Sequence, residues 1–222
     1  WTDITGLRDM AQAAEGLGFG TIYFPDHLVA EGPERQVMGV PSFDPLMQAA
    51  VVAGATSRVR IGHLVLCNLF RHPAVTGRSL ATLDQLSGGR LELGVGRGVS
   101  PIESQIFGMQ NIEQSREKYR ETLEVFFAAC SGKTLDYSGK YYQYKNVELY
   151  NKPVQKPWPP LWFPSSNRES IEFTARHGYH TAFLGKLADC RPHFERYREL
   201  WQKHRDDGGR HNAHVSAPFL AK

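Results

Sequence analysis

The chain contains the stretch Arg58-Val-Arg-Ile-Gly-His-Leu-Val-Leu-Cys-Asn-Leu-Phe-Arg-His-Pro-Ala-Val75 and then Leu83-Asp-Gln-Leu-Ser-Gly-Gly-Arg-Leu-Glu-Leu-Gly-Val-Gly-Arg-Gly98, which together decide the fold. An apolar segment, a helix opened by proline, a glycine turn and a second apolar segment follow one another. This order is the repeating unit of a parallel sheet whose faces are covered by helices. Ligands of such folds bind beyond the carboxyl ends of the strands. We therefore expect function among residues that end strands and open helices.

The same alternation continues on both sides of this stretch. It indicates a (β/α)8 TIM barrel that lacks its first strand and its C-terminal units, or a doubly wound open sheet, in a single domain over residues 1–222. The alternating, tyrosine-rich segment 136–150 predicts a hairpin outside this rhythm. The predicted helices are 3–17, 44–55, 73–87, 112–130, 167–177 and 188–204; the predicted strands are 20–24, 59–66, 90–95, 157–164, 179–184 and 214–220; the predicted loop is 30–42.

Composition excludes several classes of function. Hydrophobic residues make up 41% of the 222 residues and the net charge is only +3, so we expect neither nucleic-acid binding nor a membrane-binding face. The cysteines, Cys67, Cys130 and Cys190, lie far apart, which predicts no disulfide framework, no zinc site and a reducing, cytoplasmic setting. The chain starts inside a helical pattern without Met, so we expect a fragment whose first strand lies upstream.

Arg97 follows a predicted strand and lies between two glycines, in Leu93-Gly-Val-Gly-Arg-Gly98. Glycine lets the backbone approach an anion closely, and arginine binds phosphate through a planar fork of donors. The dinucleotide-binding fingerprint is not met, because Pro101 and a long loop stand where that motif opens directly into a helix. The alternative is that Gly96 and Gly98 only relieve crowding at the end of the strand.

Arg116 extends the apolar face of the predicted helix 112–130 by one turn toward its start. A helix that follows a parallel strand begins at the carboxyl edge of the sheet, so Arg116 should lie near Arg97. The alternative is a salt bridge from Arg116 to Glu113 or Glu117 on the same helix.

The segment Ser165-Ser166-Asn167-Arg-Glu-Ser170 joins a predicted strand to the start of a helix. Free backbone N–H groups, the helix dipole and short polar side chains at such a place bind phosphate. The alternative is ordinary N-capping by Ser166 or Asn167. Two arginines and this helix start, all at one edge, together predict a site for a single phosphate monoester.

Asp26 and His27 end another predicted strand. A histidine beside a carboxylate can move a proton near neutral pH, and the alternative is a structural hydrogen-bonded pair. The remaining histidines lack ligand spacing, so no metal is expected. The nucleophile elbow of the hydrolases and the Walker phosphate-binding loop are both missing from the sequence.

These motifs resemble the bacterial luciferase-like flavin-dependent monooxygenases over residues 3–220. The resemblance implies a (β/α)8 barrel with an insertion, and FMN or the deazaflavin F420 bound at its carboxyl-terminal mouth. The motifs that carry it are Asp26-His27, Arg60-Ile-Gly62, Arg71-His-Pro73, Leu83-Asp-Gln-Leu-Ser-Gly-Gly-Arg90, Leu93-Gly-Val-Gly-Arg-Gly98 and Phe107-Gly108.

The resemblance also implies roles for individual residues. Leu64-Val65 matches a non-proline cis peptide that lies against the flavin ring, and His27 matches a histidine beside that ring. Asp26 and Gly96 depart from the pattern, because luciferases have a catalytic histidine and a cysteine there. The implied catalytic residues are His27 and Asp26, and the implied cofactor-binding residues are Leu64, Val65, Gly96, Arg97, Gly98, Arg116, Ser166, Asn167 and Ser170, of which Arg97, Arg116, Ser166, Asn167 and Ser170 match the phosphate-binding positions.

The function implied by the resemblance is that of a flavin-dependent monooxygenase. It would oxidise a small organic substrate with O2 and with reduced FMN delivered by a separate NAD(P)H:flavin reductase, and the family predicts a homodimer. One alternative is an F420-dependent reductase or dehydrogenase on the same fold. Another is a flavin-binding protein without catalytic activity.

Overall fold

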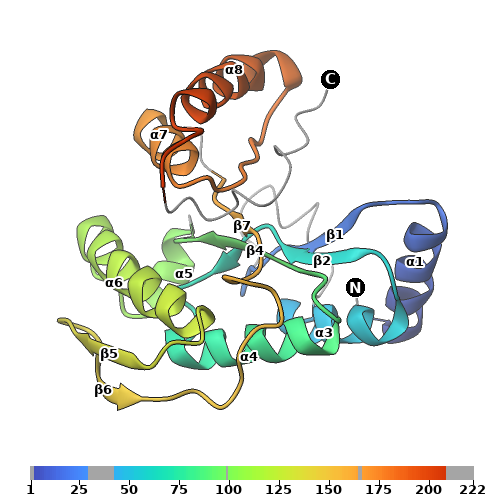
Figure 1. Ribbon diagram of the computed structural model, residues 1–222, viewed down its shortest axis with the longest axis horizontal. Coiled ribbons are helices and arrows are strands. Elements are labelled where there is room, and N and C mark those ends of the chain that lie inside the picture. The colour runs from blue at the N-terminus through green and yellow to red at the C-terminus, as the bar shows by residue number, and fades with distance from the viewer. Residues whose placement is uncertain (1–2, 30–42, 99, 165–166, 209–222) are drawn as a thin grey trace.

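The computed structural model describes residues 3–29, 43–98, 100–164 and 167–208 (Figure 1). The predicted loop at 30–42, the predicted strand at 214–220 and Ser166 lie outside the described residues. Helices and strands alternate along most of the described chain, as the sequence predicts.

A parallel sheet forms the centre of the described structure. Strand β4 pairs with β2 at its start and with β3 at its end, β7 lies along its other edge, and β1 pairs with β2. All of these pairs are parallel, so the strands end at one common edge, and the pairs formed among described residues do not close a circle. The strands are β1 (Thr21–Phe24), β2 (Arg60–His63), β3 (Leu66–Cys67), β4 (Leu91–Gly96) and β7 (Leu161–Trp162).

Four helices build the main core against this sheet: α1 (Ile4–Gly16), α3 (Pro45–Ala55), α4 (Pro73–Leu86) and α6 (Ile112–Cys130). Two of them begin at a proline, and α3 is also capped by the carboxylate of Asp44. Alternate residues of β4, namely Leu91, Leu93 and Val95, belong to the buried cluster that these helices share. The residues between them therefore point to the opposite face of the sheet.

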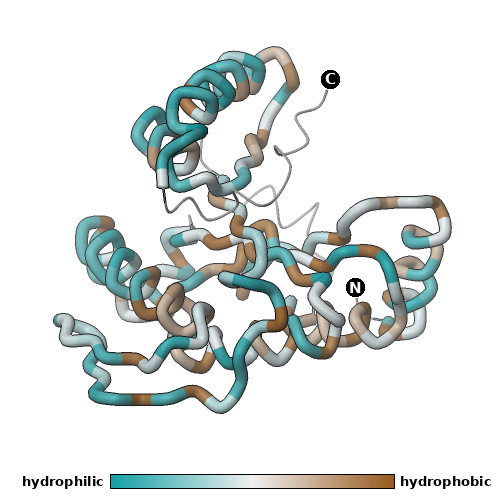
Figure 2. Tube along the Cα trace, viewed as in Figure 1, coloured by the Kyte–Doolittle hydropathy of each residue, from teal (hydrophilic) through white to brown (hydrophobic). Residues whose placement is uncertain are grey.

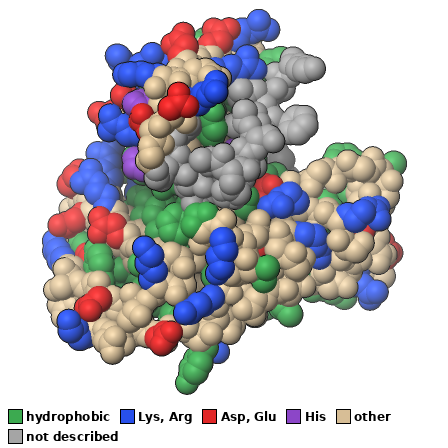
Figure 3. Space-filling view, in the orientation of Figure 1, with side chains coloured by type: hydrophobic (Ala, Val, Ile, Leu, Met, Phe, Trp, Pro, Cys, Tyr) green, Lys and Arg blue, Asp and Glu red, His purple; other side chains and the backbone are tan. Residues whose placement is uncertain are grey.

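Helices α7 (Arg168–Arg176) and α8 (Leu187–Lys203) lie across the sheet from α3 and α4 (Figure 1). They share a smaller core, and the Tyr197 hydroxyl donates to the carbonyl of Tyr179 at 2.6 Å. Their outer surfaces are strongly hydrophilic (Figure 2). Figure 3 shows hydrophobic side chains gathered in the hollow between this pair and the rest of the molecule. The expectation of a single domain over residues 1–222 stays a prediction.

Arg90 closes the amino-terminal edge of the sheet, one residue before β4. Its guanidinium donates to the carbonyls of Ser87 at 2.6 Å, Val59 and Ala53 at 2.9 Å and Thr56 at 3.1 Å. The end of α3, the start of β2 and the end of α4 are thereby joined through one side chain. Buried carbonyls need such partners, so this arginine serves the fold.

Glu92 occupies the inner face of β4, two residues after Arg90. Its carboxylate accepts from Arg60 Nε at 2.6 Å, from Trp162 Nε1 at 2.8 Å and from the Tyr23 hydroxyl. A buried carboxylate is stable when its charge is paired and its lone pairs accept hydrogen bonds, and Glu92 satisfies both conditions. Burial, followed by the negative charge of Glu92, raises the pKa of Tyr23 far above its usual range.

The segment 136–150 contains an antiparallel hairpin of β5 (Leu135–Ser138) and β6 (Gln143–Val147). The buried carboxylate of Glu121 on α6 accepts the backbone N–H groups of Tyr141 and Tyr142 at 2.9 Å. Gly139 lies so close that a Cβ there would stand 1.8 Å from Glu121 Oε1. The hairpin is therefore fixed to α6 through its main chain.

Four elements differ from the sequence-based expectation. The predicted strand 157–164 is shortened to the two residues of β7, which pair with β4. The predicted strand 59–66 is two strands, because the chain bulges at Leu64-Val65 between β2 and β3. The predicted strand 179–184 is reduced to a single bridge between His180 and Trp162. The loop expected before residue 112 contains a short helix, α5 (Pro101–Ile106), whose Ser100 cap and Glu103 form a pattern typical of helix starts.

Candidate functional site

The carboxyl ends of β1, β3 and β4 bring most of the predicted residues to one edge. Asp26 follows β1, Asn68 follows β3 and Arg97 follows β4. Two backbone hydrogen bonds tie these ends together, from Asn68 N to the carbonyl of Gly96 and from Cys67 N to Asp26 Oδ2, both at 2.9 Å. The edge predicted from the sequence therefore exists as one connected cluster, which we call the strand-end site.

The bulge at Leu64-Val65 borders this site. The peptide bond between these residues is cis, as the resemblance implied. Two glycines of β4 make room for the bulge: a Cβ on Gly94 would lie 1.8 Å from the His63 carbonyl oxygen, and one on Gly96 would lie 2.5 Å from Val65 Cγ2. The bulge therefore covers β4 at positions where no side chain fits.

Asp26 is fully engaged in the structure. Arg71 donates to both of its carboxylate oxygens, at 2.6 and 3.2 Å, and also to Asp44 Oδ2 at 2.6 Å. Such a bidentate pair, together with the bond from Cys67 N, ties β1, β3 and the start of α3 together. The structural alternative, a hydrogen-bonded pair of Asp26 with His27, differs from these contacts, because the described partners of the Asp26 carboxylate are Arg71 and Cys67 N and the carboxylate beside His27 is that of Glu103. A proton carrier needs a carboxylate that can exchange partners.

His27 has a different carboxylate beside it. Its Nδ1 lies 3.6 Å from Oε2 of Glu103, which is 2% exposed, whereas the imidazole is 41% exposed. The sequence-based reasoning missed Glu103, because it placed residues 99–111 in a loop. The Ser-Pro-Ile-Glu pattern at 100–103, a capping signature, could have revealed both the helix and the glutamate.

Arg97 turns toward the start of α6. Its Nη1 donates to the Oγ of Ser115 at 3.2 Å, and Ser115 is buried. Among the described residues no carboxylate pairs with Arg97, although it is only partly exposed. Burial raises the pKa of the adjacent Tyr119 well above its usual range, so this phenol stays neutral. A half-buried guanidinium without a carboxylate favours an anionic ligand.

Two of the other predicted phosphate-binding residues, Arg116 and Asn167, make the contacts that their structural alternatives describe. Arg116 is exposed, and its Nη1 lies 3.6 Å from Glu113 Oε2. Asn167 caps α7, accepting the backbone N–H of Ser170 at 2.8 Å. Ser166 lies outside the described residues. The structure therefore connects Arg97 to α6, while Arg116 and Asn167 have partners of their own.

Asn68 is the unusual polar group of the strand-end site. It is 3% exposed, and within the described ranges neither its Oδ1 nor its Nδ2 has a hydrogen-bond partner. A buried amide left in this state costs about 1–3 kcal/mol, so native proteins keep few of them. An orphaned amide beside a glycine-lined bulge and an unpaired arginine fits a bound polar ligand.

The family of the chain follows from comparison with known proteins. A sequence model described as luciferase-like monooxygenase matches residues 2–221. The chain belongs to the luciferase-like monooxygenase family. The uncharacterized protein y4wF of Sinorhizobium fredii is 31% identical over 211 residues, which is 95% of this chain and 58% of y4wF. The chain thus spans a little over half the length of this curated relative.

Solved structures show that this luciferase-like chain has the barrel-type α/β fold of the family. The oxygenating constituent of 3,6-diketocamphane monooxygenase from Pseudomonas putida, solved with FMN, superposes with a TM-score of 0.76 at 20% identity, over 90% of this chain and 57% of that chain. An F420-dependent secondary alcohol dehydrogenase, solved with an F420-acetone adduct, gives 0.76 at 21% identity, over 94% and 63%. At these identities the likeness concerns the fold.

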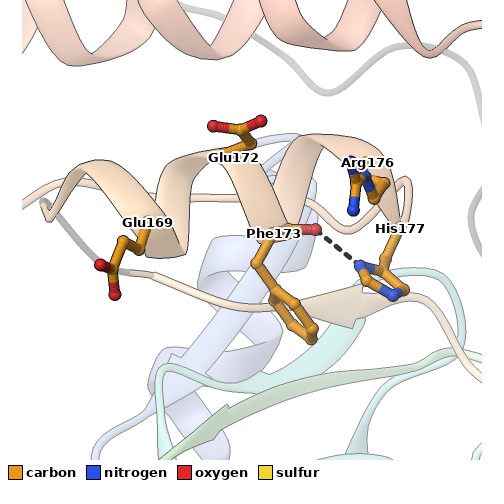
Figure 4. Close-up of a pocket in the computed structure, with 5 residues that line it drawn as sticks. All are labelled: Glu169, Glu172, Phe173, Arg176 and His177. Carbon is orange, nitrogen blue, oxygen red and sulfur yellow. Dashed lines mark hydrogen bonds between the residues drawn. The ribbon is translucent and has the colours of Figure 1, made fainter.

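A second hollow lies beside α7, outside the strand-end site. It measures about 260 Å³ and its lining comes from one helix and its cap: Glu169, Glu172, Phe173, Arg176 and His177. Figure 4 shows Phe173 and His177 on the same side of the helix, with His177 Nδ1 2.8 Å from the Phe173 carbonyl oxygen. None of the residues predicted for this luciferase-like site lines it.

In the described part of the luciferase-like chain, no three His, Cys, Asp or Glu side chains gather as metal ligands would. Nor is any described helix long and apolar enough to span a membrane.

Proposed function

We propose that this luciferase-like chain binds FMN at the strand-end site and belongs to a flavin-dependent monooxygenase that oxidises a small organic substrate with O2. A separate NAD(P)H:flavin reductase would deliver the reduced flavin. Family membership supports an oxidoreductase, and the superposition with an FMN-bound oxygenating component supports this cofactor. A homodimer and a cytoplasmic location stay predictions.

One observation carries the proposal: the charge of Arg97 has no carboxylate partner among the described residues. Arg60 pairs with Glu92, Arg71 with Asp26 and Asp44, and Arg116 with Glu113. Arg97 alone of these ends a strand beside the bulge and has only a serine hydroxyl as its described partner. A phosphate monoester offers the paired oxygens that a guanidinium binds best.

The remaining residues fit a flat ring next to that phosphate. The bulge at Leu64-Val65 borders the site, Gly96 and Gly98 let Val65 and Cys67 pack closely against the end of β4, and the Asn68 amide offers a donor and an acceptor. The start of α7, where Asn167 caps the helix and Ser170 lies in the first turn, would add backbone N–H groups to the phosphate, and Ser166 stays a sequence-based prediction for this site. Bound reduced flavin supplies the electrons for the reaction with O2.

His27 would handle protons at this site, because its ring is partly exposed and lies at the end of β1. Asp26 would act by position only. Its bidentate pair with Arg71 and its bond to Cys67 N keep the ends of β1 and β3 in register. Arg71→Ala should therefore disturb the fold, whereas His27→Ala should slow turnover at nearly unchanged FMN affinity.

The test compares two arginines and two ligands. Arg97→Ala should weaken FMN binding by about 10- to 150-fold, which corresponds to about 1.5–3 kcal/mol for a charge-assisted contact. Riboflavin, which lacks the phosphate, should bind both proteins equally. Arg116→Ala is the matched control and should change FMN affinity only about twofold, because this exposed arginine already pairs with Glu113.

The flavin fluorescence of each titration gives the dissociation constant directly. Equal losses of FMN and riboflavin affinity in Arg97→Ala would show that Arg97 does not bind the phosphate. A larger loss of FMN affinity in Arg116→Ala than in Arg97→Ala would indicate that the phosphate binds at Arg116, on the surface of α6.

A second candidate is an F420-dependent dehydrogenase or reductase on the same fold. The superposition with an F420-dependent alcohol dehydrogenase favours it, and F420 also carries a phosphate that Arg97 could bind. The absorption and fluorescence spectrum of the cofactor released from the purified full-length protein distinguishes F420 from FMN.

A further inference from the structure

Glu103 is the most deeply buried acidic group at the strand-end site, with 2% of its side chain exposed. It sits in the first turn of α5, which Ser100 caps by accepting the Glu103 backbone N–H at 3.1 Å. Its Oε1 accepts the backbone N–H of Leu28 at 2.6 Å and that of Val29 at 3.3 Å. The chain that follows β1 is thus fixed to α5 through one carboxylate oxygen.

The second oxygen of this carboxylate is the one that faces His27. It lies 3.6 Å from His27 Nδ1, just beyond hydrogen-bond distance, and catalytic contacts are often this long before a ligand binds. An ionised carboxylate only accepts hydrogen bonds, so the ring nitrogen turned toward it is the one that carries hydrogen. In the neutral ring the other nitrogen, Nε2, is then left as the acceptor.

We propose that Glu103, and not the adjacent Asp26, is the positioning residue that fixes the tautomer of His27 with hydrogen on Nδ1. Asp26 cannot do so, because Arg71 and Cys67 N already occupy both of its oxygens. The tautomer itself does not depend on the proposed function. The inference rests on that function only for the role of His27, in which Nε2 of the neutral ring accepts a proton from the bound substrate or cofactor. Glu103 itself touches neither.

The tautomer is measured on the full chain without any flavin. Protein labelled with 15N-histidine is studied by NMR at about pH 9, where an ordinary histidine is neutral. His27→Gln assigns the His27 signals among the nine histidines. The expected wild-type result is hydrogen on Nδ1 and a bare Nε2, and a wild-type ring protonated on Nε2 overturns the proposal.

Glu103→Gln gives the sharper result. The backbone N–H groups of Leu28 and Val29 require the amide oxygen at the Oε1 position, which leaves the NH2 group facing His27. That group donates, so Nδ1 must become the acceptor and the hydrogen must move to Nε2. We expect a complete exchange of the protonated nitrogen, and retention of hydrogen on Nδ1 contradicts the proposal.

Ser100→Ala is the matched control, because it loosens the start of α5 without changing the carboxylate. It should leave the tautomer unchanged, and an exchange in this variant would assign the effect to the helix instead of to Glu103. Circular dichroism checks folding, and if Glu103→Gln does not fold, the wild-type spectrum decides. Titration of the same proteins with FMN is read separately, so a failure to bind FMN refutes the proposed function and leaves the tautomer result standing.

Discussion

The two ends of strand β4 each carry an arginine, and the two arginines are used differently. Arg90, before the strand, donates to four carbonyl oxygens from three elements. Arg97, after the strand, has a single serine hydroxyl as its described partner. Two residues inward from Arg90, the Glu92 carboxylate has three partners, whereas the side-chain amide of Asn68, beside Arg97, has none among the described residues.

The two edges differ in how many of their described polar groups have hydrogen-bond or ion-pair partners within the protein. Polar groups at the amino-terminal edge satisfy each other, so that edge stabilises the fold. At the carboxyl-terminal edge, the Asn68 amide and the charge of Arg97 lack such partners among the described residues, which agrees with the ligand that we propose there. Variants at matched positions along β4 can separate the two roles.

The largest effect is expected at the middle of the strand. Gly94→Ala places a Cβ 1.8 Å from the His63 carbonyl oxygen, which is backbone and cannot move aside cheaply. The protein should lose about 3 kcal/mol or more of unfolding free energy in urea, or fail to fold. Gly54→Ala, where a Cβ meets nothing within 4 Å, is the control and should be neutral or slightly stabilising. Tolerance of Gly94→Ala would show that the bulge does not press on β4.

Arg90→Met tests the amino-terminal edge alone. It leaves several buried carbonyls without donors, so the unfolding free energy should fall by about 2–3 kcal/mol. FMN affinity should stay within about twofold, since the site is at the other edge. The reverse pattern, a stable protein with weak FMN binding, is expected of Arg97→Ala. If the two variants behave identically, the two edges of the sheet do not have separate roles in stability and in FMN binding.

The buried histidine His63, which precedes the bulge, makes the stability of the protein depend on pH. Burial lowers the pKa of this fully buried histidine to about 4. The unfolded chain takes up a proton near pH 6.5 and the folded chain does not, so stability is complete above that pH and is lost as the pH falls toward 4. The loss between pH 7 and 5 should be about 2 kcal/mol. The unfolding free energy of His63→Gln should lack this part of the pH dependence. If the variant and the wild type show the same pH dependence of stability, His63 is not its source.

The smallest effect is expected from Asn68→Leu, a change of nearly constant shape. Removing an unpaired buried amide should stabilise the protein by about 1 kcal/mol and at the same time weaken FMN binding. Thermal unfolding and flavin titration measure the two effects. A destabilised protein with unchanged FMN affinity would instead indicate a structural water at this amide.

The sequence predicted the alternation of elements and the edge at which the candidate residues of strand ends meet, because both follow from local patterns. The apolar runs around Leu91 and Leu93 and the proline at position 73 mark strands and a helix without tertiary information. The cis bond at Leu64-Val65 came from the family resemblance, since nothing local distinguishes that peptide. The shortening of 179–184 to a bridge at His180 depends on pairing across the sheet, which no periodicity encodes.

The sequence predicted where along the chain the candidate site residues lie, but not which side chains they contact. Strand ends identify Asp26, His27 and Arg97, yet their partners Arg71, Glu103 and Ser115 come from distant parts of the chain. Arg116 and Asn167 show the same limit, because each pattern was equally compatible with the salt bridge and the helix cap that the structure contains.

The anchor of the tyrosine-rich hairpin has a consequence for how this surface can change. Glu121 grips main-chain N–H groups, which every residue except proline provides, so the identities of Tyr141 and Tyr142 are irrelevant to that grip. This main-chain anchor depends on Glu121 and on the glycine at 139, while hydroxyl contacts such as Tyr137 to Glu124 and Tyr141 to Glu117 add to it from the side chains. Substitution of the exposed hairpin side chains should therefore alter the surface of the hairpin without removing its attachment to α6.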